Sequence, residues 1–292
     1  MKINLNQLKS IGWKPIAVFV IGSFWIAVFP IMLAFGSCSN TTETNVVDSA
    51  INVVETDSAD YSDSTAAAEW PRVVFKTTAG NLTLALNPEQ KEHTQNFLKL
   101  VKSKFYNGQL FHRVIKDFMV QSGDPKSVNA SPSAMIGDGG PNYTVPSEIK
   151  PNLYHFKGAL SAARQSDDVN PMKRSSGSQF FIVTGTLVDE LRMKQSMEAV
   201  AFENFKQDPA NRETILKGQA LDQSGNMAAM RELETEVQAK MQPIIDELYA
   251  KMPSDVKQRY ANWGGAPSLD NNYTVFGKMV SGYNVLSAIE NE

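Results

Sequence analysis

The sequence has few of the residues that carry covalent or metal chemistry. It contains one cysteine, Cys38, and three histidines in 292 residues. A single cysteine excludes a disulfide within the chain, so packing alone has to stabilise the folded part. His93, His112 and His155 are not at the spacing of zinc ligands, and no Gly-x-Ser-x-Gly nucleophile motif is present. We therefore expect neither a metal nor a cofactor.

Two stretches each lack charge of one sign. Residues 1–37 contain three lysines and no acidic residue, and residues 39–69 contain acidic residues but no lysine or arginine. Beyond residue 37 the chain has 25 basic and 31 acidic side chains, a formal net charge of −6. This balance argues against the clustered positive surface that nucleic-acid binding requires, so no nucleic-acid partner is expected.

The N-terminal lysines precede an uncharged run, "PIAVFVIGSFWIAVFPIMLAFGSC", that ends at Cys38. Gly36 and Ser37 just before the cysteine are typical of a bacterial lipoprotein signal, in which Cys38 would be lipidated. A run of about 20 apolar residues also suffices to span a bilayer, so an uncleaved anchor helix stays open. A third interpretation is that Cys38 is an incidental small hydrophobic residue. We expect residues 1–38 to be a signal peptide or membrane anchor, and the rest to be exported and membrane-tethered in the periplasm or cell envelope.

Residues 39–69 are dominated by Ser, Thr, Asn, Asp, Glu and Ala. Such a composition buries too little apolar surface to order itself. We expect a disordered acidic linker between the membrane attachment and a folded domain that covers residues 70–292.

The folded domain begins with a predicted hairpin, "RVVFKT" and "LTLALN", around a turn at residues 79–81. A helix is predicted next, with Asn87 as N-cap, Pro88 at its first position and Asn107-Gly108 as its stop. Short strands follow at residues 111–114, 118–121, 158–163, 179–183 and 273–279. Strands dominate without βαβ alternation, which predicts a mainly β fold: a closed antiparallel β-barrel with capping helices.

Alternation along the strands sorts the side chains into two faces. In "SQFFIVTG", Gln179 and Phe181 share one face, and Phe180 points to the other. One phenylalanine fills the barrel, so the other has to line an outer groove beside Gln179. Met119 and Gln121 repeat this pairing of an apolar side chain with an amide. Arg113 lies in the apolar stretch "FHRVIKDFMVQSGD", which predicts a groove with an apolar floor and amide and guanidinium walls.

Two long motifs, "FHRVIKDFMVQSGD" and "SSGSQFFIVTG", resemble the signature blocks of the cyclophilin-type peptidyl-prolyl cis-trans isomerases. "GDGGPNYTVPSE", "GALSAAR" and "LDNNYTVFGKMVSGYNVL" are similar to further parts of that family. The resemblance covers about residues 70–187 and 267–292. The overall organisation is similar to that of lipid-anchored members from Bacteroidetes-type bacteria.

The resemblance implies an enzyme that isomerises X-Pro bonds by stabilising the twisted amide. Arg113 would donate to the amide nitrogen, and Gln121 would orient Arg113. Four residues would form the proline pocket, namely Phe118, Met119, Phe181 and Leu269, with Tyr273 where many relatives have histidine. Ala163, Arg164 and Gln179 would lie along the bound peptide.

The sequence departs from the family pattern in several places. Ser268 stands where eukaryotic members carry a tryptophan that helps to bind cyclosporin, which puts sensitivity to that drug in doubt. Arg164 replaces a residue that is commonly asparagine. The sequence ends at Glu292, whereas relatives continue into a strand that closes the barrel; either the sequence is truncated or closure is achieved in another way.

The largest departure is an insertion at about residues 188–262, predicted to form three or four helices. Six of the twelve methionines lie there. A methionine stripe at helical spacing is typical of a core, although methionine-rich faces also serve as adaptable binding surfaces. Because the insertion begins and ends beside the expected groove, we expect it to extend a client-binding surface.

The sequence is compatible with two functions. The first is a peptidyl-prolyl isomerase that acts, as a monomer, on unfolded or proline-containing client proteins. The alternative is a non-catalytic chaperone module that binds clients through the same groove and the insertion.

Overall fold

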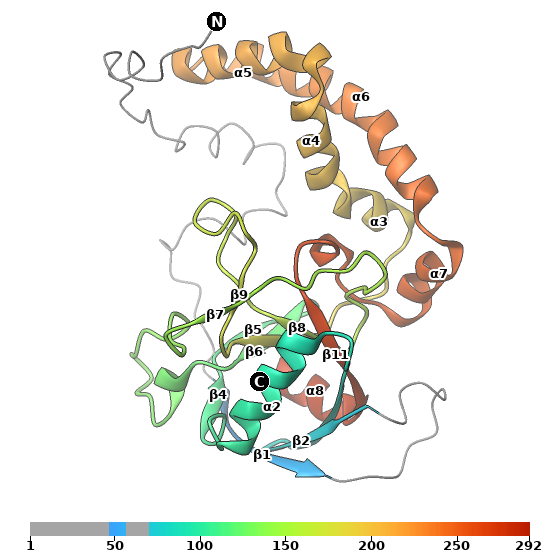
Figure 1. The fold of residues 1–292 in the computed structure, drawn as a ribbon. Helices are drawn as coiled ribbons and strands as arrows, with labels where there is room; N and C mark the ends of the chain where they lie inside the picture. The colour runs from blue at the N-terminus through green and yellow to red at the C-terminus, as the bar shows by residue number, and fades with distance from the viewer. Residues whose placement is uncertain (1–46, 57–69) are drawn as a thin grey trace, which may run out of the picture. The chain divides into compact units, whose positions relative to one another are not determined.

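The computed structural model describes residues 47–56 and 70–292. They fall into two compact units (Figure 1). The barrel unit contains the described residues up to Met197 together with Tyr249–Glu292, and the helical unit contains Glu198–Leu248. Cys38 and the apolar N-terminal run lie outside the described residues.

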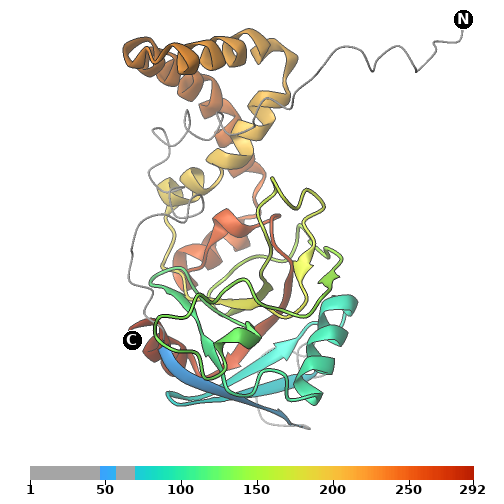
Figure 2. The same ribbon diagram turned by 90° about the vertical axis from the view of Figure 1, so that its left-hand side faces the viewer.

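The barrel unit is built on a nine-stranded sheet in which every neighbouring pair is antiparallel. Its outer strands β4 and β5 are separated in the chain only by His112, so the sheet curls back on itself (Figures 1 and 2). The predicted mainly β, antiparallel barrel is therefore confirmed. Across the sheet the order is β4 (Gln109–Phe111), β1 (Val47–Thr56), β2 (Arg72–Thr77), β3 (Gly80–Leu86), β11 (Val275–Ser281), β8 (Ala159–Ala162), β10 (Phe180–Val183), β6 (Met119–Ser122) and β5 (Arg113–Ile115). A separate ribbon pairs β7 (Thr144–Val145) with β9 (Ser175–Ser176).

Two helices cover the barrel core, α2 (Lys91–Lys102) and α8 (Tyr283–Glu290). Phe97 of α2 and Leu286 of α8 are buried in the same apolar cluster as Phe180 and Ile182 of β10. Phe180 and Ile182 thus occupy the inner face that alternation predicted for them. This capping removes both helices' apolar faces from water, which is the main source of stability for short helices.

Strand β1 corrects the expectation of a continuous disordered linker at residues 39–69. Residues 47–56 pair with β2, from Asn52 opposite Lys76 to Thr56 opposite Arg72, and with β4 through Val47 and Ile51. β1 therefore fills the place between β2 and β4, which answers how the barrel is closed beside its first hairpin. Composition averaged over 31 residues hid the short run "INVVET", whose residues favour a strand.

The expected single strand at residues 111–114 is in fact two strands broken at His112. β4 pairs with β1, whereas β5 pairs with β6, so the chain changes partner at the point where the sheet closes. His112 itself is buried.

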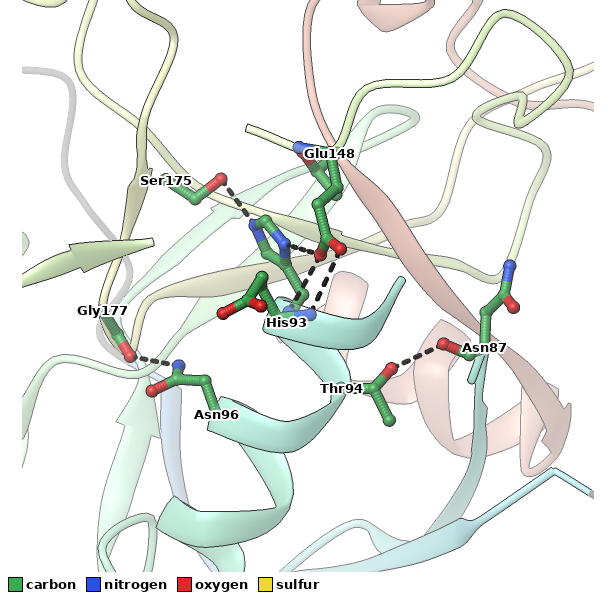
Figure 3. Close-up of polar contacts among 9 residues, drawn as sticks. Asn87, His93, Thr94, Asn96, Glu148, Ser175 and Gly177 are labelled. Atoms are coloured by element: carbon green, nitrogen blue, oxygen red, sulfur yellow. Dashed lines mark hydrogen bonds and ion pairs between the residues drawn. The ribbon is translucent and has the colours of Figure 1, made fainter. Parts of the chain in front are cut away.

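The start of α2 is held by a carboxylate from a distant loop (Figure 3). The helix begins at Lys91 after Gln90, not after the predicted cap Asn87, and Gln90 gives no side-chain cap. Instead, Glu148 accepts the backbone N–H groups of Glu92 and His93 at 3.1 and 3.0 Å. A negative charge there favours the helix because the first N–H groups have no partner within it.

His93 completes this contact. Its Nδ1 donates to Glu148 at 2.6 Å, and its Nε2 accepts from the Ser175 hydroxyl at 2.8 Å (Figure 3). Burial lowers the pKa of His93, and a neutral ring satisfies both bonds. Burial by itself would raise the pKa of the Glu148 carboxyl, but the hydrogen bonds from His93 and the two backbone N–H groups lower it. His93 is therefore a structural residue that ties α2 to β9.

The insertion forms five α-helices rather than three or four: α3 (Glu190–Ser196), α4 (Glu198–Gln207), α5 (Arg212–Ser224), α6 (Met227–Lys251) and α7 (Ser254–Trp263). α3 and α4 are separated only by Met197. The helical unit has its own core, in which Phe205, Met230, Leu233 and Met241 are buried. Met230 and Met241 are thus packed as core, whereas Met227 is exposed. None of the helices that the structure describes is long and apolar enough to cross a membrane.

Candidate functional site

The candidate site lies on the outer face of β5, β6 and β10. Arg113 is directly opposite Gln121, and Gln121 is directly opposite Phe181. Residues that pair across neighbouring strands point to the same face of a sheet. The register therefore places the guanidinium, the amide and the aromatic ring in one row.

A chain of hydrogen bonds orients Arg113. Its Nη1 donates to Gln121 Oε1 at 3.2 Å, and Gln121 Nε2 donates to Gln179 Oε1 at 2.9 Å. Gln179 Nε2 in turn donates to the carbonyls of Gly137 and Gly139 at 3.0 and 2.7 Å. Each amide uses its oxygen towards Arg113 and its nitrogen away from it, which fixes the orientation of both side chains. We call this chain the Arg113 relay.

The far end of the relay is held by Asp124, a fully buried carboxylate after β6. Asp124 accepts the backbone N–H groups of Gly137, Gly139 and Lys126, the last two at 3.0 and 2.7 Å. A Cβ at position 139 would lie 1.9 Å from Asp124 Oδ1, so only glycine fits there. The "GDGG" segment therefore supplies carbonyl acceptors to Gln179 and N–H donors to Asp124.

The floor of the site is a second apolar cluster, separate from the barrel core. Met119, Phe181 and Leu269 are buried in it, and Phe118 and Tyr273 pack against it half-buried. The rings of Phe181 and Tyr273 meet edge to face, with centroids 5.6 Å apart. All five residues that the resemblance assigned to the proline pocket are thus brought together.

Ala163 and Arg164 lie beside this floor with many of their polar groups already used. The Ala163 N–H donates to the Gln179 carbonyl at 3.0 Å, and its own carbonyl accepts the Ser176 N–H at 2.8 Å. The Arg164 guanidinium lies 4.6 Å from the centre of the Tyr273 ring and donates through Nε to the Asn272 carbonyl at 2.8 Å. Arg164 therefore covers the outer side of Tyr273.

Comparison with known proteins identifies one domain of the chain. Residues 72–202 match the model of the family "Cyclophilin type peptidyl-prolyl cis-trans isomerase/CLD". The chain contains a cyclophilin-type peptidyl-prolyl cis-trans isomerase domain.

Relatives of the cyclophilin domain carry names of the same activity. A peptidyl-prolyl cis-trans isomerase of Staphylococcus saprophyticus is 28% identical over 221 residues, which is 75% of this chain and 81% of that protein. A bifunctional phosphatase/peptidyl-prolyl cis-trans isomerase of Streptococcus pyogenes is 30% identical over 211 residues, but the match spans only 32% of its length. A solved cyclophilin-type isomerase of Cryptosporidium parvum is 22% identical, with a TM-score of 0.43, and the match covers 76% of this chain and 85% of that one.

Behind the floor lies a buried group of three polar side chains that sequence reasoning missed. Asp270, directly after Leu269, accepts from His155 Nδ1 at 2.9 Å and from the Tyr260 hydroxyl at 2.7 Å. The His155 ring is stacked on Phe181, with centroids 6.1 Å apart. Tyr260 belongs to α7, so the last helix of the insertion supports the floor of the candidate site. The only hint in the sequence was Tyr260 itself, since a buried tyrosine needs a partner for its hydroxyl.

We expect Tyr260→Phe to destabilise the protein by about 1.5–3 kcal/mol, because it removes a hydrogen bond to a buried carboxylate. Thermal unfolding of the full chain measures this loss. Tyr249→Phe is the matched control, since the Tyr249 hydroxyl at the end of α6 forms no hydrogen bond with the described residues. Equal unfolding temperatures for the two variants would contradict a supporting role of Tyr260.

The described part of the chain contains no group of three His, Cys, Asp or Glu side chains placed to hold a metal ion. The site presents a guanidinium in a defined orientation next to an apolar floor.

Proposed function

We propose that the cyclophilin domain isomerises X-Pro bonds in exported, unfolded client proteins and that Arg113 stabilises the twisted amide. The observation that carries this proposal is the Arg113 relay, which holds a half-buried guanidinium beside the floor of Met119 and Phe181.

The mechanism needs no covalent intermediate. The barrier to rotation about a peptide bond is about 18–20 kcal/mol because twisting breaks amide resonance. When the amide twists, its nitrogen becomes pyramidal and can accept a hydrogen bond. Arg113 donates to this nitrogen, while the floor holds the proline ring. Because the donor finds its acceptor only in the twisted state, the binding energy lowers the barrier rather than stabilising the planar substrate.

The experiment that tests the proposal measures exchange between the cis and trans forms of an Ala-Pro tetrapeptide by NMR, with and without the full chain. We expect faster exchange at catalytic protein concentrations. The alternative function, a non-catalytic chaperone module, predicts peptide binding without faster exchange.

We further propose that the protein is tethered in the cell envelope through a lipid on Cys38, as in the lipid-anchored members from Bacteroidetes-type bacteria that the sequence resembles. The proposal rests on the apolar run before this single cysteine and on Gly36 and Ser37. We expect mass spectrometry of the membrane form to find a diacylglyceryl Cys38 as the N-terminus. A mature protein that still begins at Met1 would favour a spanning helix instead.

The insertion has two parts with different expected contributions. The helical unit of residues 198–248 has its own core, whereas α7 supplies Tyr260 to the barrel unit. Lys194 lies 5.1 Å from the centre of the Tyr249 ring, so a short bridge can join Met197 to Tyr249.

We expect excision of residues 198–248 to leave tetrapeptide exchange almost unchanged, because all proline-pocket residues and Tyr260 remain. Excision of residues 188–262 is the matched comparison, and we expect it to abolish activity through loss of the floor's support. If the helical unit extends the client surface, the smaller excision slows proline-limited refolding of a protein substrate while the tetrapeptide rate persists. Equal losses for both substrates in a folded variant would refute this client-surface role.

A further inference from the structure

A second pocket of the barrel unit is unlike the proline site in charge. It has a volume of about 510 Å³ and lies between the start of β2, the loop at residues 152–157, α7 and β11. Four cations line it, and no carboxylate does. Aromatic rings, including Trp70 and Trp263, provide much of its wall. The four cations are Arg72, Lys157, Arg259 and Lys278.

The positive charge of this pocket is not compensated by the described residues. None of the four cations forms an ion pair with them. Two are held over ring faces instead: Lys278 Nζ is 5.6 Å from the centre of the Trp70 ring, and Arg259 Cζ is 4.3 Å from that of Phe156. Ring faces attract cations but leave their full charge in place. Four like charges around one pocket repel each other, so an anionic ligand would relieve an unfavourable arrangement.

The pocket also shares three residues with the apolar floor of the proline site. Leu153, Ala159 and Val275 belong both to its lining and to the floor cluster. β8 and β11 therefore carry parts of both sites. A polypeptide whose proline occupies the floor has further residues along its chain that can reach this second pocket.

We propose that this pocket binds acidic side chains of client polypeptides, as a subsite for residues other than the proline. This inference rests on the proposed isomerase function, because that function is the reason to expect a polypeptide as the ligand. Charge complementarity supplies the preference for Asp and Glu, and the ring faces pack against the apolar or aromatic neighbours of those residues. The subsite thus favours clients in which acidic and aromatic residues accompany the proline.

The test uses the full chain in detergent micelles and a fluorescent, proline-free peptide of Asp, Glu, Tyr and Gly. We expect saturable binding, weakened about tenfold in Lys157→Met/Lys278→Met because each exposed charge pair contributes up to about 1 kcal/mol. Methionine keeps the apolar stem of each lysine. The matched control Lys91→Met/Lys99→Met makes the same change in net charge on exposed positions of α2, and we expect it to bind normally.

Arg259→Met, at an exposed position of α7, provides a second variant in case the double substitution prevents folding. The rate of cis-trans exchange of an uncharged Ala-Pro tetrapeptide should be equal in all folded variants. This rate tests the isomerase proposal, whereas binding of the acidic peptide tests the subsite. Absence of peptide binding, or equal weakening by the control variant, would overturn the subsite. Binding of phosphate or of anionic phosphatidylglycerol vesicles in place of the peptide would overturn its assignment to clients.

Discussion

Replacement of Arg113 by alanine is expected to lower kcat/KM for an Ala-Pro tetrapeptide by a hundred- to a thousandfold while the protein remains folded. Loss of one donor aimed at a transition state typically costs about 2.7–4 kcal/mol. Arg113→Lys keeps the charge but loses the planar guanidinium that Gln121 orients at 3.2 Å, so we expect an intermediate rate. Exchange kinetics by NMR, with thermal unfolding to verify folding, measure both effects.

Lys116→Ala is the control for this prediction, because it removes an exposed positive charge three residues away. We expect it to retain nearly full activity. A fully active, folded Arg113→Ala protein would show that Arg113 is an ordinary surface charge.

The pH dependence of the rate separates donation by Arg113 from acid-base catalysis. Burial lowers the pKa of His112 below the ordinary histidine value, so its ring is already neutral at about pH 6.5 and stays neutral at higher pH. Burial raises the pKa of Tyr273 above the ordinary tyrosine value, so its hydroxyl stays protonated up to about pH 9. Neither group changes charge, and we expect a flat rate from roughly pH 6.5 to 9. A rate that falls at lower pH, as His112 becomes protonated, would indicate a general base instead.

Removal of β1 is the second change for which we expect a large effect. A chain that starts at residue 57 lacks the strand between β2 and β4, whereas one that starts at residue 47 keeps it. We expect the shorter chain to unfold about 10 °C or more below the longer one, because several strand hydrogen bonds of about 1 kcal/mol each are lost. Differential scanning calorimetry of the two chains measures the difference.

Both truncated chains lack the apolar N-terminal run, so their difference reports on β1 alone. The shorter chain should also aggregate more readily, since two strand edges lose their partner. Equal unfolding temperatures would show that β1 contributes nothing to the barrel's stability.

Much of the candidate site could be predicted from the sequence because the face on which a strand residue lies depends only on its position along the strand. Side chains alternate along a strand, so Gln121 and Phe181 could be assigned to the groove face and Phe180 to the core without knowledge of the fold. Proline and glycine marked the loops between strands. The helix boundaries were less certain, because the cap of α2 is Glu148, a residue from a loop 55 or more positions away.

The sequence by itself thus determined the antiparallel strands, the groove face of Gln121 and Phe181, and the helical nature of the insertion. Only the tertiary structure decided three further features: the place of β1 in the barrel, the hold of Asp124 on the glycine loop, and the support of the floor by Tyr260. The physical reason is the range of the interactions. Alternation and turn chemistry act between neighbours in the chain, whereas a buried carboxylate finds its partners among whatever groups the fold brings to it.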